Sequence, residues 1–540
     1  MVMEEKNINQ LPNCAIEFIK HVVKKVRYRK KVRADVQEEL ITHFEDELQE
    51  CKTEQERLEK AKELIKEFGD IKLLATLIRR AKKRCRPLWL KVFIRTAQVF
   101  GIILLYIFIC TVPLMIGRPT IKIDYVKWLN EKQQAGREES ENARVYYEKA
   151  AELLVPMPKW LSDGSYTWPT DFNDTEMKKY ESWLEQNKEP LEMLRNTVNK
   201  YDFWNYYQRT SNVGDLTVDL MPDITEHLPD YRHLAFAMRE NIRYEAYQGN
   251  IERAMDDCFV VTKMAYGIEG NGFLIEELVG IATEAIGIGE SFRILDRVDV
   301  QPDILKKTKD ELEEIYSNKK PVIIFDYEKV FWDDILQRHF TDDGNGDGRP
   351  IRSGIVYTFN TPLSSLRLLL FDYPSRKEVE TAINQFFENS DKLMSKTPKD
   401  LYEEGLDAND WAEDSYGSLF LKVEEPAFFL VSQLNWNLIT QRHALLTVLA
   451  LFLYKDKNGQ FPSDLNELVK SGYLKELPLD PFSNKPLIYK TEGNNFKLYS
   501  YGLNLKDDGG QPGKDSNGRV LKDNYNNGDW ILWPVMKPEK

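Results

Sequence analysis

The feature that most constrains this chain is a long stretch without charge. The 22 residues from Thr96 to Gly117 contain no Asp, Glu, Lys or Arg. A helix needs about 20 apolar residues to cross roughly 30 Å of hydrocarbon, so the stretch predicts one membrane-spanning helix. The alternative is the buried core helix of a soluble protein, but a core helix of this length usually carries a polar face. The helix divides the chain into a small N-terminal part and a large C-terminal part.

Basic residues are distributed unequally around this stretch. Cytoplasmic flanks keep Lys and Arg, so the richer flank predicts a cytoplasmic N-terminus and a periplasmic C-terminal part. No small-residue cleavage site follows, so we interpret residues 88–117 as an uncleaved, single-pass signal anchor in the bacterial inner membrane. The preceding flank has Arg79, Arg80, Lys82, Lys83, Arg84, Arg86, Lys91 and Arg95, and the following flank has Arg118, Lys122 and Lys127.

Length, charge and cysteine content limit the number of domains, the kinds of partner and the covalent cross-links that this chain can have. A chain of 540 residues suggests three or four domains. Its net charge of -13 argues against direct binding of nucleic acid, whereas the basic flank suits contact with anionic membrane lipid. Cys258 is the one cysteine beyond the charge-free stretch, so the outer part forms no internal disulfide. We expect a packed core to hold that part together, with metal as a further option.

Residues 1–87 are predicted to form a cytoplasmic helical domain. Apolar residues recur at helical spacing between Val36 and Leu48. Residues 53–56, Thr-Glu-Gln-Glu, have the pattern of a capping box that opens a second helix. We expect Gly69 to end that helix and Asp70 to cap a third.

The order of these elements resembles the HAAS-type helical domain at the cytoplasmic end of bacterial membrane proteins. A basic stretch precedes ADVQEELITHFEDELQE, a short break, EQERLEKAKELIKEFGD, a helix, a second basic stretch and the membrane helix. The family commonly has Pro after the Gly-Asp pair, where this chain has Ile71. The resemblance implies signalling or protein–protein contact, in some members with PadR-like transcription regulators. Any short amphipathic helical bundle is the alternative.

Residues 118–433 predict an extracytoplasmic α-helical domain, in which a solenoid is one possible arrangement. Residues 142–154 form a strong helix pattern, and a Gly249-Asn250 turn between two helices resembles one tetratricopeptide-type hairpin, without a clean repeat. In the apolar block 274–295, small residues such as Gly280 and Gly287 allow close packing. Helical folds of this type usually present binding surfaces, so we expect protein partners on this side of the membrane too.

One loop in this region has the pattern of a calcium site. Asp343, Asn345 and Asp347 alternate before Gly348, as at the start of an EF-hand loop, where alternating oxygens converge on a hard cation. The twelfth position, where the motif has a bidentate Glu, is Gly354. A missing ligand would have to come from elsewhere in the chain. A solvated turn without metal is the alternative.

Catalytic motifs are not found in the sequence. Asp333 and Asp334 invite comparison with glycosidases, but adjacent helical residues point about 100° apart and cannot face each other. We therefore expect surface acids. The histidines lack metalloprotease or triad spacing, and no nucleophile elbow or phosphate-binding loop occurs at a strand–helix junction. The sequence favours a protein that is not an enzyme, with an unrecognised extracytoplasmic hydrolase as an alternative.

Residues 434–540 resemble the globular part of the major pseudopilin of type II secretion. The matching sequences are YKDKNGQFP at 454–462, LNELVKSGYL at 465–474, LPLDPF at 477–482 and YSYG at 499–502. The resemblance implies a long helix packed on a small antiparallel sheet, and a calcium-stabilised acidic loop. The residues of that loop would be Asn504, Asp507, Asp508 and Asp529, with Asn504 where the family has an aspartate.

Pseudopilin behaviour itself is not expected. More than 400 residues precede the corresponding helix, and the membrane helix lacks the Gly-Phe-Thr-Leu-x-Glu pattern of the family. The sequence thus predicts a multidomain, mainly α protein that acts in binding, scaffolding or signal transfer across the envelope, with calcium as the expected cation. An accessory component of a type II secretion or pilus-like machine is the alternative.

Overall fold

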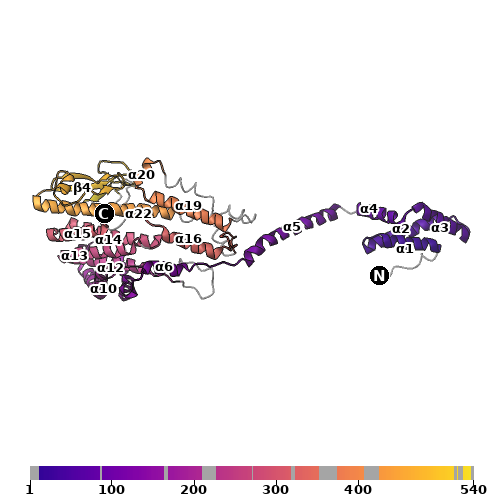
Figure 1. Ribbon diagram of the computed structural model, residues 1–540, viewed down its shortest axis with the longest axis horizontal. Coiled ribbons are helices and arrows are strands. Elements are labelled where there is room, and N and C mark those ends of the chain that lie inside the picture. The colour runs from indigo at the N-terminus through magenta and orange to yellow at the C-terminus, as the bar shows by residue number, and fades with distance from the viewer. Residues whose placement is uncertain are drawn as a thin grey trace. The chain divides into compact units, whose positions relative to one another are not determined.

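The computed structural model describes residues 11–84, 88–162, 168–208, 227–270, 272–317, 323–351, 374–406, 425–515, 520 and 527–536. The chain is mainly helical, with small antiparallel sheets near the C-terminus (Figure 1). It divides into two compact units, residues 1–111 and 112–540. Each unit has its own core, so each is described by itself.

The N-terminal unit is a small helical bundle. Thr53 forms the expected capping box with Glu56, and the Asp70 carboxylate accepts the amide protons of Lys72 and Leu73. Gly69 ends the preceding helix with φ +69°. These sequence predictions are confirmed, and the rings of Phe18, Phe44 and Phe68 pack at the centre. The helices are α1 (Asn13–Lys25), α2 (Lys30–Leu48), α3 (Glu54–Phe68) and α4 (Ile71–Arg84).

The charge-free stretch lies in one helix, α5 (Leu88–Ile116). Its residues Val92–Val112 are long and apolar enough to cross a membrane, and no part of that segment is buried inside the protein. Among the described residues it is the one helix that meets this condition. A buried core helix would be covered by other elements, so the exposure of α5 argues against that alternative.

The unit 112–540 is built from stacked helices. The first group is α6 (Tyr125–Gln134), η2 (Glu139–Glu141), α7 (Ala143–Leu153), α8 (Lys159–Ser162), η3 (Pro169–Asp171), α9 (Asp174–Gln186) and α10 (Lys188–Lys200). The second group is α12 (Leu228–Tyr247), α13 (Ile251–Ile268), α14 (Leu274–Arg297), α15 (Pro302–Ser317) and α16 (Asp326–His339). The third group is α19 (Arg376–Met394), α20 (Pro398–Glu403), α22 (Glu425–Asn458) and α23 (Asn466–Lys470).

Helices α12 and α13 form the hairpin expected from the Gly-Asn turn. Gly249 has φ +86°, a conformation in which a side chain would be strained. The hairpin continues into α14, which packs along α13 at very close range (Figure 1). A Cβ atom at Gly287 would lie 2.8 Å from the Cys258 carbonyl oxygen, and one at Gly280 would lie 2.4 Å from the Glu269 side chain. The expected role of the small residues in close packing is therefore confirmed at these two positions.

The C-terminal segment forms small antiparallel sheets beside α22 (Figure 1). β1 (Leu479–Asp480) pairs with β2 (Lys485–Pro486). β3 (Ile488–Glu492), β4 (Asn495–Ser500) and β5 (Trp530–Trp533) form a sheet in that order. Strands β3 and β4 form an antiparallel hairpin in which Ile488 lies opposite Tyr499. Phe496 stacks on Trp533 and contacts Phe452 of α22, which joins the sheet to the helix.

Helix α22 connects the C-terminal segment to the preceding helices. It begins at Glu425, ahead of the expected domain start at 434, and it packs on both α14 and α15. One continuous hydrophobic core contains residues from α7 through α22 and from the sheet, Leu194, Ile288, Leu449 and Phe496 among them. A second core joins α6, α16 and α19. The segment 434–540 is thus packed on the helical region through its longest helix.

The close approach of α13 and α14 gives a direct test. Gly287→Ala should lower the free energy of unfolding by about 1–3 kcal/mol, because the new methyl group clashes with α13 backbone. Gly289→Ala on the same helix is the matched control, since a Cβ atom there meets nothing within 4 Å. It should be neutral or stabilising by up to about 1 kcal/mol. Urea unfolding of the full chain in detergent measures both, and equal effects would contradict the proposed contact.

Candidate functional site

The loop with the EF-hand-like pattern is a tight turn stabilised by its own backbone. The Asp343 carboxylate accepts the amide protons of Asn345 at 2.7 Å and Asp347 at 3.2 Å, and the Asp343 amide donates to the Asp347 carbonyl oxygen at 2.8 Å. Gly344 and Gly346 both have positive φ, as the turn requires. The structure thus brings together Asp343, Asn345 and Asp347. Gly354, at the twelfth position, lies outside the described residues.

The carboxylates of this loop already have partners within the chain. Asp347 accepts the amide protons of Lys377 at 3.1 Å and Gly348 at 2.7 Å, and these bonds lower its pKa. Asp342 forms ion pairs with Lys122 at 2.5 Å and Arg376 at 3.1 Å. The bond from Lys122 is the main cause of the lowered pKa of Asp342. The carboxylates are therefore ionised, as a cation site needs, but are neutralised in part by the protein itself.

In the C-terminal acidic loop, three of the four predicted residues, Asn504, Asp507 and Asp508, lie near the fourth, Asp529. Asp529 accepts the amide protons of Asp508 at 3.1 Å and Gly510 at 2.6 Å. The Asn504 side-chain amide donates to the Asp508 carboxylate at 2.6 Å. Burial raises the pKa of Asp529, and the nearby charges of Asp507 and Asp508 raise it further. Asp507 accepts the Tyr499 hydroxyl at 3.1 Å. Carboxylates that repel one another in this way favour a bound cation.

A ready-made metal cage is not present in the described part of the chain. No group of three or more His, Cys, Asp or Glu side chains there is arranged to hold a metal ion. The loops supply oxygen atoms of the type that calcium prefers, but their side chains are directed mainly at backbone amides. Calcium at Asp343, Asn345 and Asp347, or at Asn504, Asp507, Asp508 and Asp529, therefore stays a prediction.

The described residues of the unit 112–540 form at least three clefts on its surface. A polar cleft of about 610 Å³ lies between α9, α10, α12 and α13. At its edge the Arg195 guanidinium donates hydrogen bonds of 2.6 and 2.7 Å to the buried Asp257 carboxylate. Asn241 donates to the same carboxylate at 2.9 Å. Its described lining contains charged residues of both signs but neither histidine nor cysteine. Such a cleft can bind a polar ligand, but it holds no nucleophile–base pair of the Ser–His or Cys–His type.

The two other clefts differ in character. One of about 560 Å³ lies between the C-terminal end of α5 and the loop 341–349, and Gly117, Asp343 and Asp347 are part of its lining. The other, of about 420 Å³, is mainly apolar and lies between α20, the first half of α22 and the end of η4 (Gly502–Asn504). Leu401, Trp436 and Leu503 line this apolar cleft. Concave apolar sites of this size are typical of small-ligand binding.

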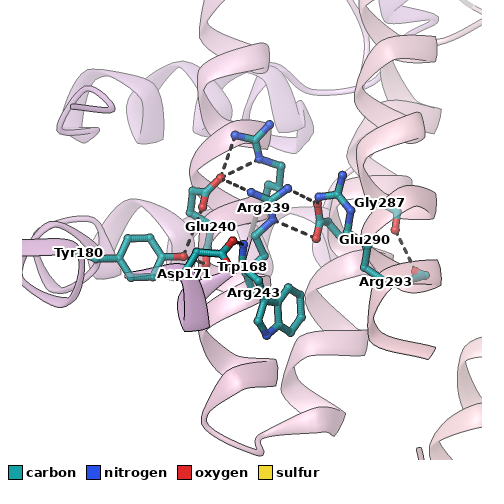
Figure 2. Close-up of polar contacts among 10 residues, drawn as sticks. Trp168, Asp171, Tyr180, Arg239, Glu240, Arg243, Gly287, Glu290 and Arg293 are labelled. Atoms are coloured by element: carbon teal, nitrogen blue, oxygen red, sulfur yellow. Dashed lines mark hydrogen bonds and ion pairs between the residues drawn. The ribbon is translucent and has the colours of Figure 1, made fainter. Parts of the chain in front are cut away.

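A buried ionic network joins α9, α12 and α14 (Figure 2). Arg243 donates to Glu240 at 3.0 Å and to both oxygens of Glu290 at 2.7 and 3.1 Å. Figure 2 shows Arg239 on the other side of Glu240 and Arg293 beside Glu290. Burial is the largest influence on Arg243, but the two glutamates outweigh it and raise the pKa of that guanidinium. Both buried carboxylates have guanidinium partners, so the network specifies how the helices pack.

A second buried network attaches α22 to α14. Arg442 of α22 donates to both oxygens of Glu284 at 2.5 and 2.7 Å and to Glu269 at 2.8 Å. The guanidinium lies over the ring of Tyr316 at 5.0 Å. Two buried carboxyl groups thus share one cation. Burial and the neighbouring Glu269 raise the pKa of Glu284.

Glu276, at the start of α14, is a further buried acid. It accepts the Phe273 amide proton at 2.6 Å and the Tyr207 hydroxyl at 2.9 Å. Burial raises the pKa of Glu276 to about 7. Strongly perturbed acids often mark active sites, but neither Glu276 nor Glu284 lines any of the three clefts. Glu276 is held instead by the Phe273 amide and the Tyr207 hydroxyl, and Glu284 by Arg442.

Two interpretations of the sequence are corrected here. Asp334 is not a surface acid, because it is buried in α16 and pairs with Arg338 at 2.8 Å. Burial also raises the pKa of Asp333 to about 6. The block 274–295 is not simply apolar, since its glutamates are buried. The sequence contains a signal for a buried ion pair, which is an isolated Glu within an apolar helical run. Such a Glu is buried with the run, and a buried charge needs a partner.

Comparison with known proteins does not assign these features to a family. No family model matches the chain, and no significant match was found among curated proteins or among solved structures. The function is therefore argued from the chain itself.

The attachment of α22 can be tested at Arg442. Arg442→Met should lower the free energy of unfolding by about 3–5 kcal/mol, because it leaves Glu269 and Glu284 buried without a cation. Glu131→Gln is the control, since it removes an exposed ion pair with Lys127 at 3.7 Å and should change stability by less than about 1 kcal/mol. Urea unfolding of the full chain measures both variants. A loss of similar size in the two would contradict the role given to Arg442.

Proposed function

We propose that the chain is a single-pass protein of the bacterial inner membrane that acts in binding, scaffolding or signal transfer. The observation that carries the proposal is helix α5, whose apolar segment Val92–Val112 contains no buried residue. About a dozen large apolar side chains between Val92 and Ile109 are exposed. A soluble monomer rarely tolerates a patch of this size, whereas a bilayer covers it.

The orientation proposed is the one that the basic flank favours. The N-terminal bundle would lie in the cytoplasm, where HAAS-like domains contact proteins such as PadR-like regulators. The unit 112–540 would lie in the periplasm. Its clefts, which bring together charged and apolar side chains from separate helices, support binding of a partner rather than a catalytic role.

Membrane integration is tested by extraction and topology together. The full chain should stay with the membrane in alkaline carbonate, and an alkaline phosphatase fused after residue 540, but not after residue 87, should be active. Replacing both Leu104 and Ile107 by Arg should release the chain, because each Arg at the helix centre costs about 2.5–3.5 kcal/mol. Leu153→Arg, at an exposed apolar position of α7, is the control and should not. Extraction of the unchanged protein would overturn the proposal.

The alternative role, as a component of a secretion or pilus-like machine, rests on the C-terminal resemblance. In such machines the long helix assembles with copies of itself. Here α22 packs along α14 and α15, and Arg442 ties it to Glu284. This packing favours a docking or scaffolding use of the C-terminal segment over assembly through its helix.

We also propose that calcium stabilises the C-terminal acidic loop. The mutual repulsion of Asp507, Asp508 and Asp529 supports this, because a cation would relieve it. Calcium at one hundred times its dissociation constant should add about 2.7 kcal/mol to stability. Thermal unfolding of the full chain in calcium and in EDTA measures the shift.

Two variants assign the effect to one loop. Asp508→Asn should reduce the calcium shift if the C-terminal loop binds the ion, since among the described residues the Asp508 carboxylate accepts one side-chain hydrogen bond, from Asn504. Asp343→Asn should reduce the shift only if the other acidic loop contributes. An unfolding temperature that is the same in calcium and in EDTA would remove calcium from both loops.

A further inference from the structure

Helix α4, just before the membrane helix, has two different apolar sides. Leu74, Ala75 and Ile78 face the bundle core and α1. Leu73 and Leu77 are 61% and 52% exposed. With about 100° between successive residues, Leu73 lies on the side of the helix away from the core, and Leu77 lies on the flank beside it. The bundle therefore does not use them for its own packing.

Basic residues continue the same outer side. Arg80 falls within about 60° of Leu73 and Leu77 on the helix circumference. Arg79, Arg80 and Lys83 are exposed and form no salt bridge with any described residue. Lys82 lies on another side, where it pairs with Glu39 at 2.5 Å. The outer side of α4 thus combines two exposed leucines with Arg80 and Lys83, in a chain whose net charge is -13, and Arg79 lies on the flank away from Leu77.

The distance to the membrane helix is short. Four residue steps connect Arg84, the last residue of α4, to Leu88, the first of α5. A fully extended chain covers about 14 Å in four steps, so the end of α4 stays close to the start of the membrane helix. Trp89 is 69% exposed one residue further on, and Trp favours the level of the lipid headgroups.

We propose that α4 lies on the membrane surface, with Leu73 and Leu77 at the boundary of the acyl chains and its basic residues on anionic headgroups. An apolar stripe bordered by Lys and Arg is the pattern of interfacial helices, and cations next to a membrane helix attract anionic lipid. This inference rests on the proposed membrane location of α5. It adds that the N-terminal bundle is held against the bilayer and does not extend freely from it.

The test uses the full chain in lipid nanodiscs. The native cysteines are replaced by alanine, and a nitrobenzoxadiazole label is placed at Leu77→Cys. The matched control is Leu58→Cys in α3, an exposed leucine of the same bundle (39%) that is not on α4. The discs contain phosphatidylcholine alone or with about one third phosphatidylglycerol. The neutral quencher acrylamide measures access from water, and nitroxide lipid measures contact with the headgroups.

The expected result is specific to position 77. In discs with phosphatidylglycerol the label there should be several-fold less accessible to acrylamide than the label at position 58, and nitroxide lipid should quench it. Arg80→Gln with Lys83→Gln should restore acrylamide access and abolish nitroxide quenching at position 77. The expected change is roughly fivefold in the surface-binding equilibrium for each charge removed. High salt should also increase acrylamide access and decrease nitroxide quenching at position 77.

Other outcomes overturn the inference in distinguishable ways. Equal acrylamide access at positions 77 and 58 in both lipid mixtures means that α4 does not lie on the surface. Protection at position 77 without nitroxide quenching means that a protein, such as a second copy of the chain, covers the leucines. Failure of the chain to enter the nanodiscs contradicts the proposed function itself. This outcome is detected by a separate measurement, which asks whether the chain co-elutes with the disc scaffold.

Discussion

Helix α14 is the element on which the unit 112–540 depends. One side of it approaches α13 so closely that Gly280 and Gly287 leave no room for a side chain. Its buried glutamates receive cations from two other helices, since Glu290 binds Arg243 of α12 and Glu284 binds Arg442 of α22. Removing a partner would leave a charge without compensation in the core, which is far more costly than losing an exposed ion pair. The helices therefore pack in one arrangement.

This arrangement explains why the C-terminal segment is attached firmly to the helical region. Hydrophobic contact alone would allow α22 to shift along α14, because apolar burial has no direction. A bidentate pair from Arg442 to Glu284 fixes both position and rotation. The sheet follows α22 through Phe452 and Trp533. The segment that resembles a pseudopilin is thus positioned by a single helix that belongs to both parts.

Sequence reasoning succeeded where the determining contacts are local. The capping box at Thr53, the cap at Asp70 and the turn at Gly249 each depend on residues a few positions apart, so the pattern contains all the information. The buried acids were missed because their partners are distant. Glu284 and Arg442 are separated by 158 positions, and neither residue alone shows that the other neutralises it. The acidic loops lie between these two cases. Their residues come close together as expected, but the binding of an ion depends on chemistry outside the chain.

The two ends of α5 are joined to folded structure by short segments, which bears on the proposed signal transfer. At its C-terminal end, the Gln337 side chain of α16 accepts the amide protons of Lys122 and Ile123 and donates to the Ile123 carbonyl oxygen. At its N-terminal end, three residues separate α4 from α5. A long flexible linker would absorb a displacement, whereas a clamped linker passes it to the helix. A ligand that binds two states of the unit 112–540 unequally would shift their populations, and a displacement of α16 would then reach the C-terminal end of α5. The same construction would be unnecessary in a passive anchor, so it favours signal transfer among the proposed roles.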